Sequence, residues 1–218
     1  MININKLNDN LHKTLAKGRV ALSQPAGCPK ISLYLFDPHV LEGPLSHDEA
    51  LAVVAEPAYW SFCWASGQVL AHFILTHPET VKNKVVVDVG SGSGVVAIAA
   101  AMAGAKSVYA CDIDDDALDA TRMNSQANKV IVHTIKDLSD VGETIDLITA
   151  ADVLYDRDNF SLLTQFTELA SKVLLADSRV KKLPVDDYIL QTTIEARTWP
   201  DLNEFEEFNQ VRIYALSH

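Results

Sequence analysis

Cysteine is scarce in this sequence, and the cysteines form no pattern. The 218 residues include three, Cys28, Cys63 and Cys111, with no CxxC pair and no cluster of cysteine and histidine. A disulfide framework needs paired cysteines, and a structural zinc site needs closely spaced Cys and His ligands. We therefore expect reduced thiols in a cytoplasmic compartment and no bound metal.

Positive charge and long apolar runs are scarce as well. The sequence contains 18 Lys and Arg against 29 Asp and Glu, a net charge of -11. Nucleic acids and anionic membranes bind clustered cations, so we expect neither as a partner. No apolar run reaches the roughly 20 residues that cross a bilayer, and the first residues show neither a secretion signal nor a transit peptide. The acidity favours a basic substrate segment, although solubility alone explains the same balance.

The chain is organised around residues 85–94, which read VVVDVGSGSG. The β-branched run predicts a strand that is buried on both faces. The apolar stretch 95–103, ended by Gly104, predicts a buried helix after the glycine turn. A strand, a glycine turn and a helix N-terminus place backbone N–H groups where a nucleotide-like or carboxylate-bearing ligand binds.

Strands and helices alternate through the rest of the chain. The expected strands are 85–89, 107–111, 130–134, 145–151, 173–176, 188–195 and 211–216, and the expected helices are 66–76, 95–103, 115–128 and 159–171. This alternation predicts an α/β fold with a doubly wound, mostly parallel sheet of seven strands. No long apolar helix joins the last two strands, so the final strand is expected to be antiparallel. Asp114 is the expected N-cap of the helix that begins at residue 115.

Residues 1–57 contain no separate core, and we expect them to form an extension that packs on a main domain of residues 58–218. The local predictions in this extension are a surface helix carrying Leu7, Leu11 and Leu15 and ended by residues 25–27, a strand at 31–36, and a capping box between Ser46 and Glu49.

The glycine spacing and one acidic residue narrow the ligand class. Gly90 and Gly92 fit the first two positions of a dinucleotide fingerprint, but Val95 stands where the third glycine is required. No GKS or GKT follows, so the turn is not a P-loop. Asp88 would repel a pyrophosphate and suits a ligand with an ammonium or sulfonium group. A nicotinamide-linked oxidoreductase is therefore disfavoured.

Two further positions fit a nucleoside ligand. Asp112 ends the strand 107–111, where a carboxylate accepts both hydroxyls of a ribose. Asp114 is better placed than Asp112 to cap the following helix, which favours the ribose role. Asp137 and Leu138 follow the strand 130–134, where a polar group and an apolar side chain would hold an adenine.

These motifs resemble a known family. VVVDVGSGSG, followed by CDID and KDL, is similar to the motifs of the seven-strand S-adenosylmethionine-dependent methyltransferases over roughly residues 58–216. The resemblance implies S-adenosylmethionine as the methyl donor and S-adenosylhomocysteine as the product. It also implies cofactor contacts from Trp64, Asp88, Gly90, Ser91, Gly92, Gly94, Asp112, Ile113, Asp137 and Leu138.

The stretch 152–155 reads DVLY and resembles the DxxY group of protein-lysine methyltransferases. Residues 60–70, the run 90–105 and the stretch DVLYDRDN are similar to the electron-transfer-flavoprotein β-subunit lysine methyltransferases and to bacterial relatives often named nicotinamide N-methyltransferase-like. The resemblance implies a lysine of a protein as the acceptor, with the flavoprotein β subunit or a ribosomal protein as candidates. The loop 177–179 matches this group only in part, which leaves the substrate open.

A sulfonium methyl donor places chemical requirements on the site that binds the acceptor amine. A lysine ammonium must lose a proton before it attacks, and an in-line displacement needs both reactants aligned in a dry pocket. The resemblance gives Asp152 and Tyr155 catalytic roles: Asp152 binds and orients the amine, and Tyr155 packs against it or accepts its hydrogen bond. Asp156 and Asp158 are better placed than Asp152 to cap the next helix.

Two alternatives remain open. The chain would instead be an N-methyltransferase of a small amine metabolite if residues 1–57 close the site as a lid. It would be a non-catalytic scaffold that binds S-adenosylmethionine if no transfer occurs, although the presence of both Asp152 and Tyr155 speaks against this. We expect a monomer.

Overall fold

The computed structural model describes residues 3–40, 57–202 and 205–216. The capping box expected between Ser46 and Glu49 lies outside these residues. Within them, no helix is both long and apolar enough to cross a membrane.

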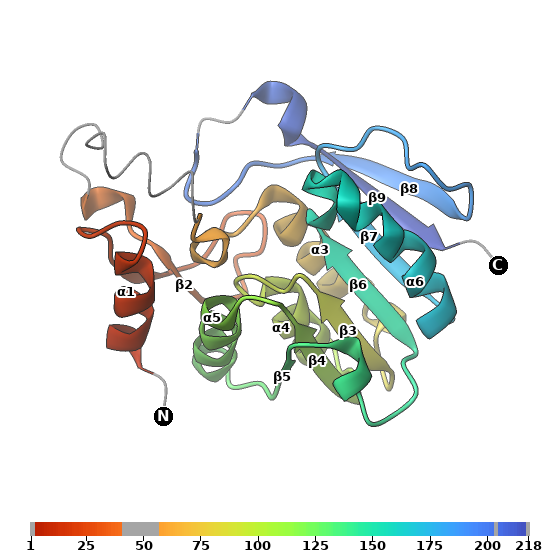
Figure 1. Cartoon of the computed structure of the whole chain (residues 1–218), viewed down its shortest axis with the longest axis horizontal. Coiled ribbons are helices and arrows are strands. Elements are labelled where there is room, and N and C mark those ends of the chain that lie inside the picture. The colour runs from red at the N-terminus through yellow and green to blue at the C-terminus, as the bar shows by residue number, and fades with distance from the viewer. Residues whose placement is uncertain (1–2, 41–56, 203–204, 217–218) are drawn as a thin grey trace.

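The main sheet has seven strands in the order β5-β4-β3-β6-β7-β9-β8 (Figure 1). The strands are β3 Val85–Val89, β4 Ser107–Cys111, β5 His133–Ile135, β6 Leu147–Ala151, β7 Val173–Asp177, β8 Tyr188–Glu195 and β9 Gln210–Leu216. Strands β3 to β7 pair in parallel, and β9 runs antiparallel to both β7 and β8. The doubly wound sheet with an antiparallel last strand is thus confirmed.

Helices cover both faces of the sheet, and the alternation of side chains along each strand explains why. Val86 joins a core cluster with Leu70 of α3 (Ala65–Thr76) and Ile98 of α4 (Val95–Met102). The next residue, Val87, joins the opposite cluster with Phe166 of α6 (Ser161–Leu169). Successive side chains of a strand point to opposite faces, so a continuous valine run requires cover on both.

The helix α5, Asp115–Ala127, follows β4 and begins at the predicted cap. Asp114 accepts a hydrogen bond from the backbone N–H of Asp116 at 2.8 Å. The carboxylate thereby satisfies one of the N–H groups that have no partner within the helix.

The N-terminal residues correct the prediction for this segment. The helix α1, Ile4–His12, ends well before residues 25–27, and a strand β1, Val20–Ser23, follows and pairs antiparallel with β2, Leu33–Phe36. The sequence interpretation missed β1. It also took α1 for a surface helix, whereas Leu7 and Leu11 are completely buried. Leucines four residues apart share one face of a helix, and here that face packs with Trp60 and α5.

Among the other differences from the expected elements, two are the clearest. The strand expected at 130–134 is β5, His133–Ile135, because the chain leaves α5 through Lys129 in a left-handed conformation, φ 57°. The helix expected at 159–171 is split into a 3₁₀ turn, Arg157–Phe160, and α6. Asp156 caps the 3₁₀ turn by accepting from the N–H of Asp158 at 3.0 Å.

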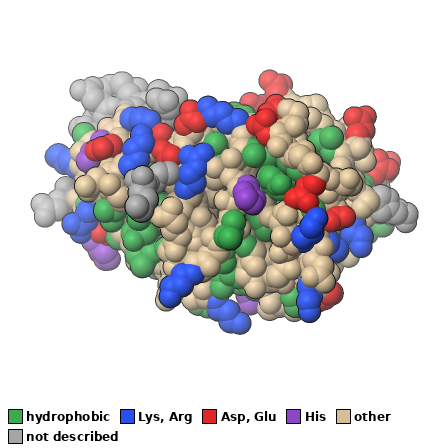
Figure 2. Space-filling view, turned by 90° about the horizontal axis from the view of Figure 1, so that it is seen from below, with side chains coloured by type: hydrophobic (Ala, Val, Ile, Leu, Met, Phe, Trp, Pro, Cys, Tyr) green, Lys and Arg blue, Asp and Glu red, His purple; other side chains and the backbone are tan. Residues whose placement is uncertain are grey.

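One face of the molecule is shown in Figure 2. Its Lys and Arg side chains are scattered among acidic and apolar ones and do not form one continuous basic surface.

Candidate functional site

The glycine turn between β3 and α4 is kept free of side chains for two different reasons. Gly90, Gly92 and Gly94 all have positive φ, of 68°, 50° and 80°. A Cβ at Gly90 would lie 2.6 Å from Cγ1 of Val153, and a Cβ at Gly94 would lie 2.8 Å from Oγ1 of Thr121. A Cβ at Gly92 would meet nothing within 4 Å. The outer two glycines therefore permit close packing, whereas Gly92 borders open space that a ligand can approach.

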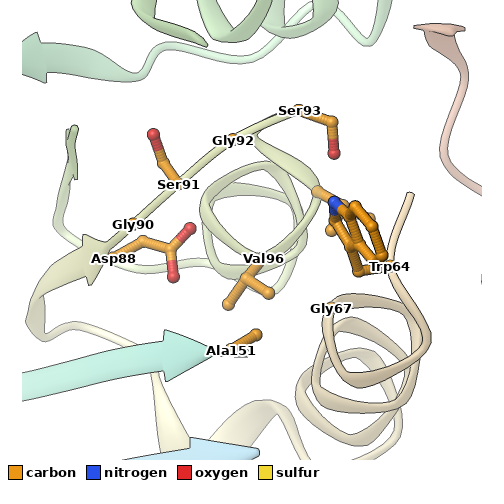
Figure 3. Close-up of a pocket in the computed structure, with 10 residues that line it drawn as sticks. Trp64, Gly67, Asp88, Gly90, Ser91, Gly92, Ser93, Val96 and Ala151 are labelled. Carbon is orange, nitrogen blue, oxygen red and sulfur yellow. The ribbon is translucent and has the colours of Figure 1, made fainter. Parts of the chain in front are cut away.

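A pocket lies beside this turn, between the ends of β3 and β6 and the start of α3 (Figure 3). Within it, the hydroxyl of Ser91 is buried and finds no hydrogen-bond partner among the described residues. Buried hydroxyls are seldom left unsatisfied, so a polar ligand atom here would complete the site. The residues that line the pocket are Trp64, Gly67, Asp88, Gly90, Ser91, Gly92, Ser93, Val95, Val96 and Ala151.

Asp88 lines the pocket, but protein groups already hold its carboxylate. Its Oδ1 accepts from the hydroxyl of Thr149 at 2.9 Å, and its Oδ2 accepts from the N–H of Ala97 at 3.2 Å. Burial raises the pKa of Asp88 to about 7, although both hydrogen bonds lower it. The carboxylate fixes α4 against β6 and adds negative potential to the pocket wall.

Asp112 joins the glycine turn to the start of α5. Its Oδ2 accepts from the N–H of Gly92 at 2.9 Å, and its Oδ1 accepts from the N–H of Asp114 at 3.1 Å. Burial raises the pKa of Asp112, and these two N–H groups lower it. Each oxygen accepts one described hydrogen bond, which leaves capacity for a hydroxyl pair. The structure therefore places the carboxylate of Asp112 against the backbone of Gly92.

Five residues expected at the ligand are not among those that line the pocket: Gly94, Asp112 and the three residues described next. Ile113 follows Asp112 and is 90% exposed. Asp137 caps the short turn Leu138–Asp140, where it accepts from the N–H and the hydroxyl of Ser139, and these bonds lower its pKa. Leu138 packs against the core cluster on the α6 face.

A second group of polar residues surrounds Asp152, immediately after β6. Asp152 has a φ of 53°, a left-handed conformation that is uncommon outside glycine. Its Oδ1 accepts from the hydroxyl of Ser66 at 2.6 Å and from the hydroxyl of Ser178 at 2.9 Å. The backbone N–H groups of the same two serines lie 3.3 Å and 3.2 Å from its Oδ2 and Oδ1. Asp152 thereby joins the start of α3, the end of β6 and the segment after β7.

Tyr155 completes the 3₁₀ turn Val153–Tyr155 that follows Asp152, and it is 60% exposed. Its ring centroid lies 5.7 Å from that of Tyr59. Tyr59 lies 5.7 Å in turn from Trp64, whose indole N–H donates to the carbonyl oxygen of Tyr59 at 3.0 Å. The aromatic segment before α3 and the DVLY stretch therefore form one surface.

Asp177, the last residue of β7, is a second carboxylate beside Asp152. Its Oδ1 accepts from the N–H groups of Arg179 and Val180, whereas its buried Oδ2 has no partner among the described residues. Burial and the charge of Asp152 raise the pKa of Asp177 to about 6. Two carboxylates thus meet at the carboxyl edge of the sheet, where α/β proteins bind their ligands.

Sequence reasoning missed several residues of this site. It gave no role to Thr149 or Ser178, it quoted Ser66 only as part of a motif, and it considered Tyr59 only as part of the aromatic segment 58–64, which is either helix-packing core or a wall of the ligand pocket. Ser66 and Asp152 are separated by 86 residues, so no local pattern connects them. Within the described parts of the chain, no group of His, Cys, Asp and Glu side chains is arranged to hold a metal ion.

Comparison with known proteins gives one family match. A family model described as ribosomal protein L11 methyltransferase (PrmA) matches residues 72–172. This range contains the glycine turn, Asp112 and the DVLY stretch.

Among curated relatives, the electron transfer flavoprotein beta subunit lysine methyltransferase of Homo sapiens is 35% identical over 129 residues. The match covers 55% of this chain and 48% of that protein, so the chain spans about half the length of this relative.

Two solved structures show the same fold. The ribosomal protein L11 methylase of Lactobacillus delbrueckii subsp. bulgaricus superposes with a TM-score of 0.53 at 25% identity, covering 70% of this chain and 79% of that one. The magnesium protoporphyrin IX methyltransferase of Synechocystis PCC 6803, determined with bound SAM, superposes with a TM-score of 0.54 at 18% identity, covering 82% and 87%. The second likeness concerns the fold alone.

Proposed function

Because the chain is a relative of the electron transfer flavoprotein β-subunit lysine methyltransferases and has the fold of S-adenosylmethionine-dependent methyltransferases, we propose that it transfers a methyl group from S-adenosylmethionine to a lysine side chain of a protein. The observation that carries this proposal is the placement of an open glycine turn and the Asp152–Tyr155 pair at one edge of the sheet.

The glycine turn is the donor side of this site. The buried hydroxyl of Ser91 without a partner and the open space above Gly92 fit a nucleoside amino acid. Asp112 would accept the ribose hydroxyls, and the wall containing Trp64 and Asp88 would hold the amino-acid end. When bound, the donor supplies a methyl group already activated by its sulfonium.

Ile113, Asp137 and Leu138 remain candidates for the adenine end. Their positions beside Asp112 and after β5 support this assignment, although none of them lines the pocket beside the turn. The exposed Ile113 side chain offers an apolar surface for one face of a purine.

The DVLY stretch is the acceptor side. The negative charge of Asp152 favours an approaching ammonium, and the exposed Tyr155 lies in the 3₁₀ turn that directly follows it. The buried Oδ2 of Asp177 adds a nearby carboxylate that attracts the same charge. Loss of one proton to solvent or to such a carboxylate then makes the amine nucleophilic, and the surrounding residues hold it in line.

A protein acceptor is favoured over a small amine by the exposure of the acceptor side. Tyr155 and Tyr59 are both accessible in the presence of the packed α1, β1 and β2 segments.

We also propose that residues 1–57 form an extension that packs on a main domain of residues 58–218. We also propose a monomeric protein of a reducing, cytoplasm-like compartment that binds neither nucleic acid nor membrane; the three free, buried cysteines support the reducing compartment.

Incubation with methyl-labelled S-adenosylmethionine and a lysate of the source organism tests the proposed function. The expected result is label in a protein band whose hydrolysate contains methylated lysine. Label found only in small molecules would favour the metabolite methyltransferase instead. Binding of S-adenosylmethionine without any transfer would favour the scaffold.

A further inference from the structure

Three aromatic rings are neighbours next to the Asp152 segment, and the reaction as described so far gives no role to one of them, Tyr59. We call the rings of Tyr59, Trp64 and Tyr155 the aromatic wall. Tyr59 belongs to the 3₁₀ turn Tyr59–Ser61, and Trp64 precedes α3. The two tyrosines come from segments almost a hundred residues apart in the sequence, yet their ring centroids are 5.7 Å apart.

The tilt of the rings leaves aromatic faces open. The planes of Tyr59 and Tyr155 meet at 44°, and those of Tyr59 and Trp64 meet at 60°. Parallel stacked rings would cover each other's faces fully, whereas tilted rings cover them only in part. Tyr59 remains 44% exposed and Tyr155 remains 60% exposed. Large exposed aromatic side chains in contact with one another commonly mark a binding surface.

Hydrogen bonds fix the wall to the acceptor side. Ser66, two residues after Trp64, donates its hydroxyl to Asp152, three residues before Tyr155. The indole of Trp64 donates to the carbonyl oxygen of Tyr59. The wall therefore keeps a defined position relative to the carboxylate of Asp152.

The charges around the wall favour a cation as its ligand. The carboxylates of Asp112 and Asp156 lie close enough to Tyr155 to raise the pKa of its hydroxyl, together with burial and the neighbouring Tyr59. The whole chain carries a net charge of -11. The π faces of tyrosine and tryptophan attract cations without requiring an N–H donor on the ligand.

The hydrogen bonds of Asp152 show why the carboxylate alone is not a sufficient receptor. Its Oδ1 already accepts from three protein donors and its Oδ2 from one. Little accepting capacity remains for an incoming ammonium, and most of it is on Oδ2.

We propose that the aromatic wall binds the ammonium group of the acceptor side chain through its π faces, with Tyr59 as a residue that selects a cation over a neutral group of the same shape. This inference rests on the proposed transfer to an amine. It assigns Asp152 mainly to positioning, since that residue holds the segments that carry the wall.

The test compares binding of two short capped peptides to the full chain. One peptide carries Nε-trimethyl-lysine, and the other carries its neutral isostere with carbon in place of nitrogen. A quaternary ammonium donates no N–H, so the comparison isolates charge over an aromatic face. The expected result is about threefold to tenfold tighter binding of the cation. Tyr59→Leu removes most of this preference, and Tyr59→Phe retains most of it.

Tyr155→Leu provides a second measurement on the same wall if Tyr59→Leu fails to fold. Ile131→Ala, at a 79% exposed side chain in the loop before β5, is the control and should bind both peptides as the unaltered chain does. Equal binding of the two peptides would overturn the proposal, and so would an unchanged preference in a folded leucine variant.

Different results would contradict the role of the aromatic wall and the proposed methyl transfer to protein. A chain that methylates protein lysine but shows no ring-dependent preference contradicts only the aromatic wall. A chain with the preference but no transfer to protein contradicts only the proposed function.

Discussion

The donor side and the acceptor side of this site are built in different ways. Most of the donor side comes from one β3–turn–α4 unit with Asp112 one strand away, while Trp64, Gly67 and Ala151 of its pocket come from the start of α3 and from β6. The acceptor side combines Tyr59, Ser66, Asp152 and Ser178, from three separate stretches of chain. The first is therefore largely a local device, whereas the second exists only once the sheet has formed.

This difference explains how the two sides hold their polar groups. Asp88 and Asp112 are each fixed by backbone N–H groups of the turn or the helix that follows it. Asp152 depends on side chains and N–H groups contributed by α3 and by the segment after β7. We expect substitutions on the acceptor side to affect transfer more than donor binding, and the following variants test that expectation.

Asp88→Asn should give the largest effect on stability. The pKa of Asp88 is about 7 in the folded chain, above its ordinary value of 3.8. The stabilisation from the protonated form is complete below pH 3.8, and it is lost as the pH rises through 7. At 1.36 kcal/mol per pKa unit, the folded chain loses at most about 4 kcal/mol over this range.

Urea unfolding of the unaltered chain and of Asp88→Asn at several pH values measures this effect. The difference in unfolding free energy should change in favour of the variant between pH 4 and pH 7. A difference that stays constant over this interval would show that Asp88 titrates normally.

Asp152→Ala should lower kcat about 100-fold, because the amine loses its alignment and the segments around it lose a common acceptor. The affinity for S-adenosylhomocysteine should change little, since the donor side does not depend on Asp152. Single-turnover transfer and calorimetric binding measure the two properties. Asp158→Ala, at an exposed carboxylate in the next turn, is the matched control. An equal loss of donor affinity would contradict the separation of the two sides.

Asp112→Ala should have the complementary effect. Loss of hydrogen bonds from a charged acceptor costs about 1.5–3 kcal/mol, which corresponds to roughly 10- to 100-fold weaker donor binding. Acceptor binding should stay unchanged. Calorimetry with S-adenosylhomocysteine measures the affinity, with Asp158→Ala, an exposed carboxylate with no assigned donor role, as the control. Unchanged donor affinity in Asp112→Ala would remove its ribose role.

Gly92→Ala should have the smallest effect on stability, about 1–2 kcal/mol, because a Cβ there meets open space but φ is positive. Gly94→Ala should cost more, since its Cβ would also lie 2.8 Å from Thr121. Thermal unfolding of both variants gives the comparison. A larger loss in Gly92→Ala would contradict the assignment of open space to that position.

The difference between local and long-range contacts also determines how much of the fold and of the site could be predicted from the sequence. The strands β3, β4 and β8 were predicted to the residue, because composition and turn residues mark them locally. The glycine turn and Asp112 were predicted for the same reason. Asp88 was predicted as a ligand group, and its bond to Thr149 could not be foreseen, since it forms only when β6 lies beside β3.

The N-terminal segment shows most clearly what could not be predicted from the sequence alone. The leucines of α1 predicted a surface helix, but their burial depends on Trp60 and α5, far along the chain. β1 is a four-residue strand that exists by pairing with β2, and nothing in its own composition requires it. Tyr59 was likewise invisible as a partner of Tyr155, because only the fold brings the two rings together.

A crystal structure of the chain with S-adenosylhomocysteine tests the central claim most directly. We predict that the ribose hydroxyls lie within hydrogen-bond distance of Asp112 and that the sulfur faces the space between Asp152 and Tyr155. A ligand bound away from Gly92, or one whose sulfur points away from the aromatic wall, would contradict the account.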